Sequence, residues 1–151
     1  MLSGNKRDKQ TILQLYDKIL PSLAGRINSD IAGVIPMFHN YGLERQVNTW
    51  SGATAAGAAE EVSIEKGNVQ QLGLKLRLEG FDRAGIPPFD VYKELVFRLE
   101  QDHYLVGPNN DTTWLEKQYG QDWSKNEYDD IATRWSGELV DEITKQLEKL
   151  T

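Results

Sequence analysis

The stretch Gln71-Leu-Gly-Leu-Lys-Leu-Arg-Leu-Glu79 alternates leucine with polar residues or glycine. Successive side chains of a β-strand point to opposite faces of its sheet, so residues two apart share a face. In such a strand one face carries only leucines, and the other carries Gln71, Lys75, Arg77 and Glu79. This pattern predicts a half-buried antiparallel strand whose inward face consists of Leu72, Leu74, Leu76 and Leu78.

The residues before this strand also have strand and turn signals. Leu43–Trp50 predicts a first strand, and the small uncharged residues of Ser51–Ala59 predict a loop after it. Glu61–Lys66 alternates again and predicts a second strand. Gly67–Asn68 tolerates the positive φ of a tight turn, so we expect Glu61–Lys66 to form a hairpin with the leucine strand.

The segment that follows, residues 90–100, fits two structures. Tyr92, Leu95, Val96 and Leu99 would share one face of a helix, whereas Leu95, Phe97 and Leu99 would share one face of a strand. The β-branched and aromatic residues, with a break at Gln101–Asp102 before His103–Val106, favour a hairpin. The middle of the chain is therefore predicted to be an antiparallel meander of four or five strands.

The first part of the chain predicts a helix from about Lys6 to Asn28. Pro21 lies inside it and has no N–H to bond to the carbonyl of residue 17, so we expect a kink or a restart there. The apolar residues of this segment recur at spacings of three and four, which places them on one helix face: Ile12, Tyr16, Ile19, Leu23 and Ile27.

The last part of the chain predicts a short helix and then a long one. Thr113 and Glu116 have the spacing of a capping box, and Gly120 would end the short helix. Ser124 and Glu127 repeat this spacing, flanked by Trp123 and Tyr128 at the positions of a hydrophobic staple. From Tyr128 an apolar stripe continues to Leu150, which predicts a helix of about 26 residues.

These elements predict an α+β fold: one two-layer domain over residues 1–151. The N-terminal helix and the long C-terminal helix are the elements long enough to cover the leucine face of the antiparallel sheet, and the short helix precedes the long one. A long C-terminal helix across an antiparallel sheet is similar to the arrangement of helix-grip ligand-binding domains, a likeness of fold that several functions share.

Composition and charge limit the function. The 151 residues include no cysteine, which excludes disulfides, thiolate metal sites and cysteine nucleophiles, and the formal net charge is −6. Residues 1–86 have ten basic and nine acidic side chains, whereas residues 87–151 have seven and fourteen. Such an acidic chain argues against nucleic-acid binding, and no apolar run is long enough to cross a membrane. A cytoplasmic location is expected.

The strongest functional signal is a group of aromatic and acidic residues in the last third of the chain. It predicts a non-catalytic interaction module, such as an inhibitor, immunity-type or chaperone-like protein, that binds a basic protein partner. Trp114 and Trp123 flank predicted helix starts, and core packing is the favoured interpretation of these aromatic residues. Partial exposure is the alternative and would let either serve as an apolar anchor. The candidate contacts are Trp114, Trp123, Asp122, Glu127, Asp129 and Asp130.

A second hypothesis is a helix-grip-like domain that binds a small molecule, with or without enzymatic activity. Its apolar pocket would lie between the leucine face and the last helix, with Trp50, His39 and His103 as candidate lining residues. Neither histidine has a second histidine or a carboxylate at metal-binding spacing, so no metal site and no cofactor is predicted.

Overall fold

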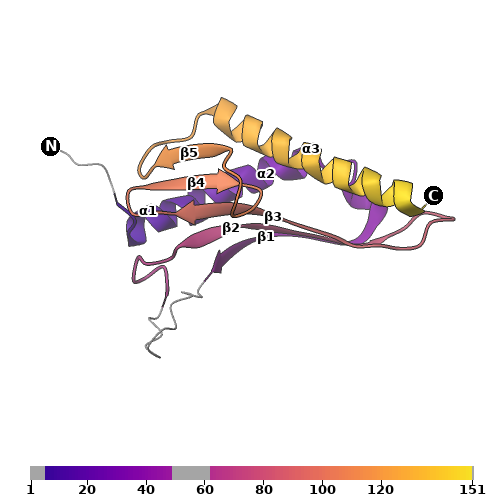
Figure 1. The fold of residues 1–151 in the computed structure, drawn as a ribbon, viewed down its shortest axis with the longest axis horizontal. Coiled ribbons are helices and arrows are strands. Elements are labelled where there is room, and N and C mark those ends of the chain that lie inside the picture. Colours follow the sequence, from indigo (N-terminus) through magenta and orange to yellow (C-terminus); the bar gives the residue numbers. More distant parts are fainter. Residues whose placement is uncertain (1–5, 49–61, 151) are drawn as a thin grey trace.

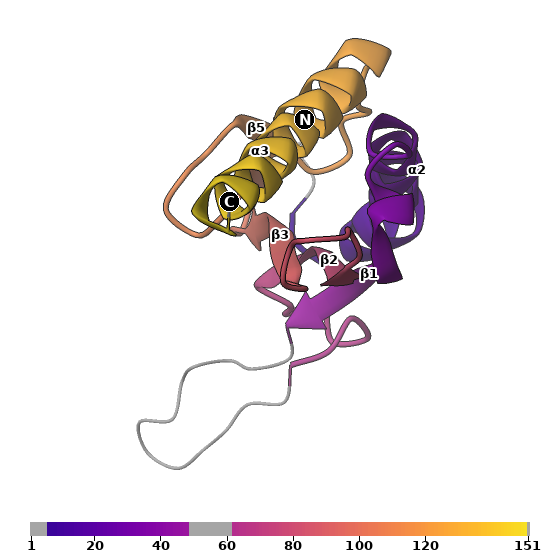
Figure 2. The same cartoon turned by 90° about the vertical axis from the view of Figure 1, so that its right-hand side faces the viewer.

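The computed structural model describes residues 6–48 and 62–150. It confirms the predicted two-layer α+β fold: one antiparallel sheet of five strands, in the order β1-β2-β3-β4-β5, forms one layer. The helices form the other layer and lie on the same side of the sheet, as Figures 1 and 2 show. The opposite side of the sheet has no helix over it in the described part of the chain.

Each strand pairs with the next strand along the chain, so the sheet is a simple meander. Residues 91–99 are a strand, which confirms the hairpin interpretation of this segment and excludes the helical one. The strands are β1 (Phe38–Asn48), β2 (Gln71–Phe81), β3 (Val91–Leu99), β4 (His103–Gly107) and β5 (Leu115–Gln118).

The leucine face of β2 is the centre of the core, as predicted. Leu72, Leu74, Leu76 and Leu78 have at most 2% of their surface exposed. The register places Phe97 and Leu95 of β3 beside the first two of these leucines, and paired residues share a face. The buried residues of the helices complete the same core.

The N-terminal helical segment is interrupted where the sequence predicts it. Helix α1 (Lys9–Gln14) leads into a single π-helical turn, η1 (Leu15–Ile19), and then α2 (Leu20–Asp30) begins. Pro21 lies in the first turn of α2, the position where a helix tolerates proline best. The π-helical turn η1, which is wider than an α-helical turn, thus connects α1 to α2 just before the proline. A single 3₁₀ turn, η2 (Ile35–Met37), then leads into β1.

The long C-terminal helix α3 spans Lys125–Leu150, 26 residues, as predicted. The capping box is present: the Glu127 N–H donates to Ser124 Oγ at 3.1 Å, and the Ser124 N–H donates to Glu127 Oε1 at 2.9 Å. The staple is present as well, with the rings of Trp123 and Tyr128 5.2 Å apart. These contacts fix where α3 begins.

The predicted strand Glu61–Lys66 is wrong. Its described residues form a turn, which is closed by a hydrogen bond from the Gly67 N–H to Ile64 O at 2.9 Å. Gly67 has the expected positive φ of 68°, but it belongs to this turn and not to a hairpin. The partner of β2 is instead β1, which begins five residues earlier than the predicted Leu43. Trp50 and the predicted loop Ser51–Ala59 lie outside the described residues.

The predicted short helix over Thr113–Gly120 is also wrong, because this segment forms β5 at the edge of the sheet. The Trp114 N–H donates to Val106 O at 2.7 Å, and the residues that follow continue the pairing with β4. Thr113 Oγ1 accepts a hydrogen bond from Arg98 at 2.6 Å and caps no helix. Gly120 has a φ of 84° and lies in the turn after β5.

Candidate functional site

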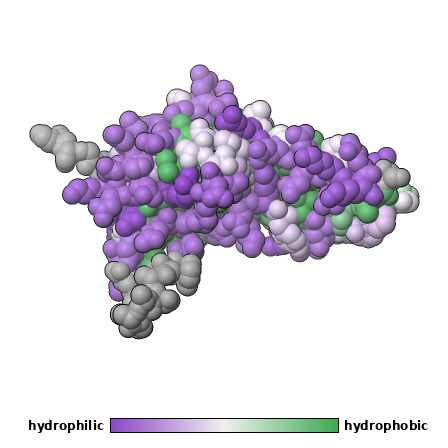
Figure 3. Space-filling view, viewed as in Figure 1, coloured by the Kyte–Doolittle hydropathy of each residue, from purple (hydrophilic) through white to green (hydrophobic). Residues whose placement is uncertain are grey.

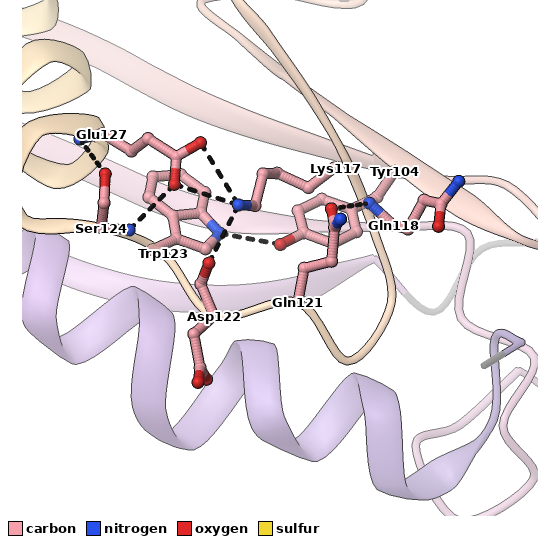
Figure 4. A network of polar contacts seen from close by, with 8 residues as sticks. All are labelled: Tyr104, Lys117, Gln118, Gln121, Asp122, Trp123, Ser124 and Glu127. Atoms are coloured by element: carbon pink, nitrogen blue, oxygen red, sulfur yellow. Dashed lines mark hydrogen bonds and ion pairs between the residues drawn. The ribbon is translucent and has the colours of Figure 1, made fainter. Parts of the chain in front are cut away.

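The acidic and aromatic residues of the last third meet where β5 turns into α3 (Figure 4). The centre of this cluster is the ammonium group of Lys117 on β5, whose side chain is 10% exposed. It donates to Glu127 Oε1 at 3.0 Å, to Glu127 Oε2 at 3.2 Å and to the backbone carbonyl of Asp122 at 2.9 Å. Three acceptors thus satisfy the three N–H donors of a lysine.

Trp123 belongs to the core and not to the surface. It is 7% exposed, and its indole N–H donates to the Tyr104 hydroxyl at 2.7 Å. Its ring stacks on Phe97 with the centroids 5.9 Å apart. Burial raises the pKa of Tyr104 to about 12, so this hydroxyl stays protonated at neutral pH. Trp123 thus has the core packing that the sequence favours, and it offers no anchor to a partner.

Trp114 is partly buried and lies just before β5, where the sequence analysis placed a helix start. The guanidinium of Arg134 on α3 lies over its ring, 5.2 Å from the centroid, which is the distance of a cation–π contact. This contact ties the connection before β5 to the middle of α3.

Most of the predicted contact acids have partners within the protein. Asp122 lies 3.2 Å from Lys18, and Asp129 lies 2.7 Å from Lys125 and 2.9 Å from Arg26. The Lys125 and Arg26 hydrogen bonds hold the pKa of Asp129 below its usual range. Glu127 is occupied by Lys117, as described above. Of the four acids, Asp130 alone makes no ion pair or hydrogen bond within residues 6–48 and 62–150.

Asp129 borders a groove between the two main helices. The groove has a volume of about 550 Å³, and small side chains of α2 line it opposite α3. A second hollow of about 530 Å³, along the first turns of α3, shares Asp129 and Thr133 with it and adds Asp130. We call both hollows together the α2–α3 groove, and its walls include Ser22, Gly25 and Ser29 of α2 and Asp129, Asp130 and Thr133 of α3.

The α2 wall of this groove was missed in the sequence analysis, although a signal exists. Ser22, Gly25 and Ser29 recur at spacings of three and four on the helix, opposite the buried Leu23 and Ile27. A Cβ placed on Gly25 would meet no atom within 4 Å, so the space above this residue is open. Small residues at this spacing allow a third helix to approach closely.

The groove carries negative charge. Asp30 at the end of α2 lines it, and like Asp130 it makes no ion pair or hydrogen bond in the described part of the chain. Arg26 also lines the groove, but Asp129 neutralises it at 2.9 Å, and its guanidinium lies over the ring of Tyr128. Among the described acids of the two hollows, Asp30 and Asp130 are thus the ones whose charge remains for a ligand.

The residues of the alternative ligand pocket do not come together. His39 lies near the start of β1, 3.6 Å from Asp82, and His103 begins β4, with its Nδ1 2.6 Å from Asp102. The register places these two pairs at opposite ends of the sheet, and Trp50 lies outside the described residues. Between the leucine face and α3, fully buried side chains such as Trp135 and Leu139 fill the interior.

Apolar side chains reach the surface at the end of the molecule where α3 terminates, seen in green in Figure 3. Met37 is 46% exposed there, and Ile86 and Phe89 of the β2–β3 connection are partly buried against the core. The rings of Phe89 and Phe81 stack with their centroids 4.6 Å apart, so the β2–β3 connection packs against the buried Phe81.

Within the described residues, no three histidine or acidic side chains are arranged to hold a metal ion, and no helix has the length and apolarity to span a membrane. No family model, curated protein or solved structure matches the chain.

Proposed function

We propose that the protein is a cytoplasmic, non-catalytic interaction domain that binds a basic helical segment of a partner protein in the α2–α3 groove. The observation that supports this proposal is the location of the acidic side chains that have no ion pair in the described residues. Internal ion pairs occupy Asp122, Glu127 and Asp129. Asp30 borders the hollow between α2 and α3, Asp130 borders the adjoining hollow on α3, and both keep their charge for a ligand.

The shape of the groove supports a helix as the occupant. Two helices already form its walls, and a third one packs on them best where side chains are small, at interaxial distances of about 8–10 Å. Ser22, Gly25 and Ser29 provide such a wall, and the space above Gly25 is open. Amphipathic helices laid into a groove are a common mode of peptide recognition.

The charge of the groove supports a basic partner. Asp30 and Asp130 attract lysine and arginine side chains and repel an acidic helix, so they select the partner and speed its encounter. Because both acids are exposed, this attraction is screened at physiological salt, where the Debye length is about 8 Å. The association should therefore weaken as salt increases.

The test is affinity purification of the full chain from its native cells, with quantitative mass spectrometry of what is bound. Asp130→Lys reverses one groove charge, and Gly25→Leu fills the groove without a clash, because a Cβ there meets no atom within 4 Å. The matched control is Asp141→Lys, a charge reversal on the exposed side of the same helix and outside the groove.

We expect one basic protein to be enriched by the wild type and by Asp141→Lys, and lost with Asp130→Lys and Gly25→Leu. Its recovery should also fall between low and high salt. If Asp141→Lys loses the basic protein to the same degree, the binding is a general charge attraction, which would contradict a binding site in the groove. The same bound proteins for all four forms of the chain would overturn the proposal.

A further inference from the structure

A further hollow, separate from the α2–α3 groove, lies on the side of the sheet that faces away from the helices. It has a volume of about 480 Å³ and is bordered by the ends of β1 and β3 and the start of β2. Three of its lining residues form a row across these strands, because Asn48 pairs with Gln71 and Gln71 pairs with Arg98. Paired residues share a face, and Leu72 next to Gln71 points to the core, so this row points outward.

Two guanidinium groups border this hollow, and each is held by a hydrogen bond. Arg98 Nη2 donates to Thr113 Oγ1 at 2.6 Å. Arg7 lies beside the end of β3, where its backbone N–H donates to Gln101 O at 2.8 Å and its Nη1 donates to Leu99 O at 2.9 Å. Each guanidinium has further N–H donors beyond the one it uses.

Neither guanidinium contacts a carboxylate in the described part of the chain, although the protein is acidic overall. Arg77 and Arg45, by contrast, have acidic partners: Arg77 lies 3.2 Å from Glu79 and Arg45 lies 3.2 Å from Asp17. Among the described lining residues, the hollow thus has two unneutralised cations and one anion, the exposed Glu100. The other polar side chains that line the hollow are amides: Asn48, Gln70, Gln71, Gln101 and Asn110.

We infer that this hollow, the Arg7–Arg98 pocket, binds a phosphate monoester of a small hydroxyl-rich molecule. Guanidinium forks match phosphate oxygens in geometry and charge. Donors from Arg7, Arg98 and the amides come from different strands and from the N-terminal segment, which suits a tetrahedral group that accepts from several directions. A planar carboxylate is satisfied by one fork.

The size and the remaining lining define the rest of the ligand. A volume of about 480 Å³ lies within the usual range of small-molecule sites, and phosphate alone would leave much of it unfilled. Amide groups and the Glu100 carboxylate hydrogen-bond hydroxyl groups, and no aromatic ring lines the described pocket. A sugar phosphate has this combination of groups. The inference is independent of the α2–α3 groove, which lies in the helical layer.

The test is an NMR titration of the ¹⁵N-labelled full chain with glucose 6-phosphate, inorganic phosphate and acetate, each at millimolar concentration. We expect both phosphates to shift the side-chain Nε–Hε signals of Arg7 and Arg98 and the side-chain amide signals of Gln70 and Gln71. Glucose 6-phosphate should bind more tightly than inorganic phosphate, because its hydroxyls engage the amides and Glu100. Acetate should leave these signals in place.

Arg98→Gln should weaken glucose 6-phosphate binding roughly tenfold to a hundredfold, the usual effect of losing a charge-assisted contact. Arg77→Gln, on the same face of the sheet but paired with Glu79, is the matched control and should change nothing. If Arg98→Gln does not give a folded spectrum, Arg7→Gln takes its place. Equal shifts with acetate, equal weakening by Arg77→Gln, or no shifts at Arg7 and Arg98 would each overturn the inference.

Discussion

Lys117 and Glu127 form an ion pair beneath the first turn of α3, with Nζ 3.0 Å from Oε1. The same Oε1 accepts the backbone N–H of Ser124 at 2.9 Å, so one carboxylate both caps the helix and neutralises the lysine. Since Lys117 lies on β5, this carboxylate fixes the start of α3 to the edge of the sheet.

Removing the charge of Glu127 should therefore cost more than removing the serine of the capping box. Ser124→Ala loses one cap acceptor and should lower the free energy of unfolding by about 1 kcal/mol. Glu127→Gln also leaves Lys117, which is 10% exposed, without its anion, and should cost about 3 kcal/mol. Urea unfolding of both variants measures the difference.

The double variant Lys117→Met with Glu127→Gln is the control for this prediction, because it removes both charges together. Replacing a buried pair by apolar or neutral groups is often close to neutral, so the double variant should be more stable than Glu127→Gln alone. Equal costs for Glu127→Gln and Ser124→Ala would show that the ion pair adds nothing to the cap.

The same carboxylate should make stability depend on pH in the acidic range. The backbone N–H of Ser124, and then Lys117, hold the pKa of Glu127 below its usual value, although burial opposes this. In the unfolded chain the pKa returns to about 4.3. The contribution of Glu127 is thus complete above that pH and is lost as the pH falls toward the folded pKa. Melting temperatures of Glu127→Gln should fall less steeply below pH 4.5 than those of the wild type.

A truncation in the leucine face should be far more costly than one on the opposite face of the same strand. Leu74 is fully buried, so Leu74→Ala should lower the free energy of unfolding by about 2–5 kcal/mol. Lys75 is its exposed neighbour, and Lys75→Ala should change stability by no more than about 0.5 kcal/mol. Similar costs for the two variants would contradict the burial of this face.

The fold was predictable from the sequence wherever a local pattern has one solution. Leu72 to Leu78 can share a face only in a strand, and Ser124 with Glu127 forms a capping box that the structure contains. Thr113 and Glu116 have the same spacing, but there β5 forms instead. The edge of β4 supplies backbone partners, as in the bond from the Trp114 N–H to Val106 O, and a local motif cannot reveal a partner that lies elsewhere in the chain.

The candidate sites were less predictable, because they depend on which side chains meet. The sequence marks Asp129 and Asp130 as equivalent neighbours, yet Arg26, 103 residues away, pairs with Asp129 and leaves Asp130 unpaired. Likewise Arg7 and Arg98 are two isolated arginines until the meander places them beside one hollow. Such contacts arise from the register and from the packing of α2 on α3.

A methyl group at Gly73 should be poorly tolerated. Glycine is otherwise unfavourable inside a strand such as β2, so a larger residue would ordinarily be expected to stabilise it. A Cβ built on Gly73 would lie 1.9 Å from the backbone oxygen of Leu95, which belongs to the neighbouring strand β3 and cannot move alone. Gly73→Ala should therefore cost about 3 kcal/mol, at the upper end of overpacking penalties. A melting temperature equal to that of the wild type would contradict this close approach.

A methyl group at Gly25 should have the opposite effect, since this glycine is exposed in the middle of α2 and a Cβ there meets no atom within 4 Å. Gly25→Ala removes conformational freedom from the unfolded chain and should raise the free energy of unfolding by about 0.5–1 kcal/mol. Gly137→Ala in α3, where a Cβ also meets nothing within 4 Å, is the matched control and should stabilise by a similar amount. Thermal unfolding of the two variants measures both effects. If Gly25→Ala destabilises while Gly137→Ala does not, the space above Gly25 is filled, and the wall of the α2–α3 groove is not open as the structure places it.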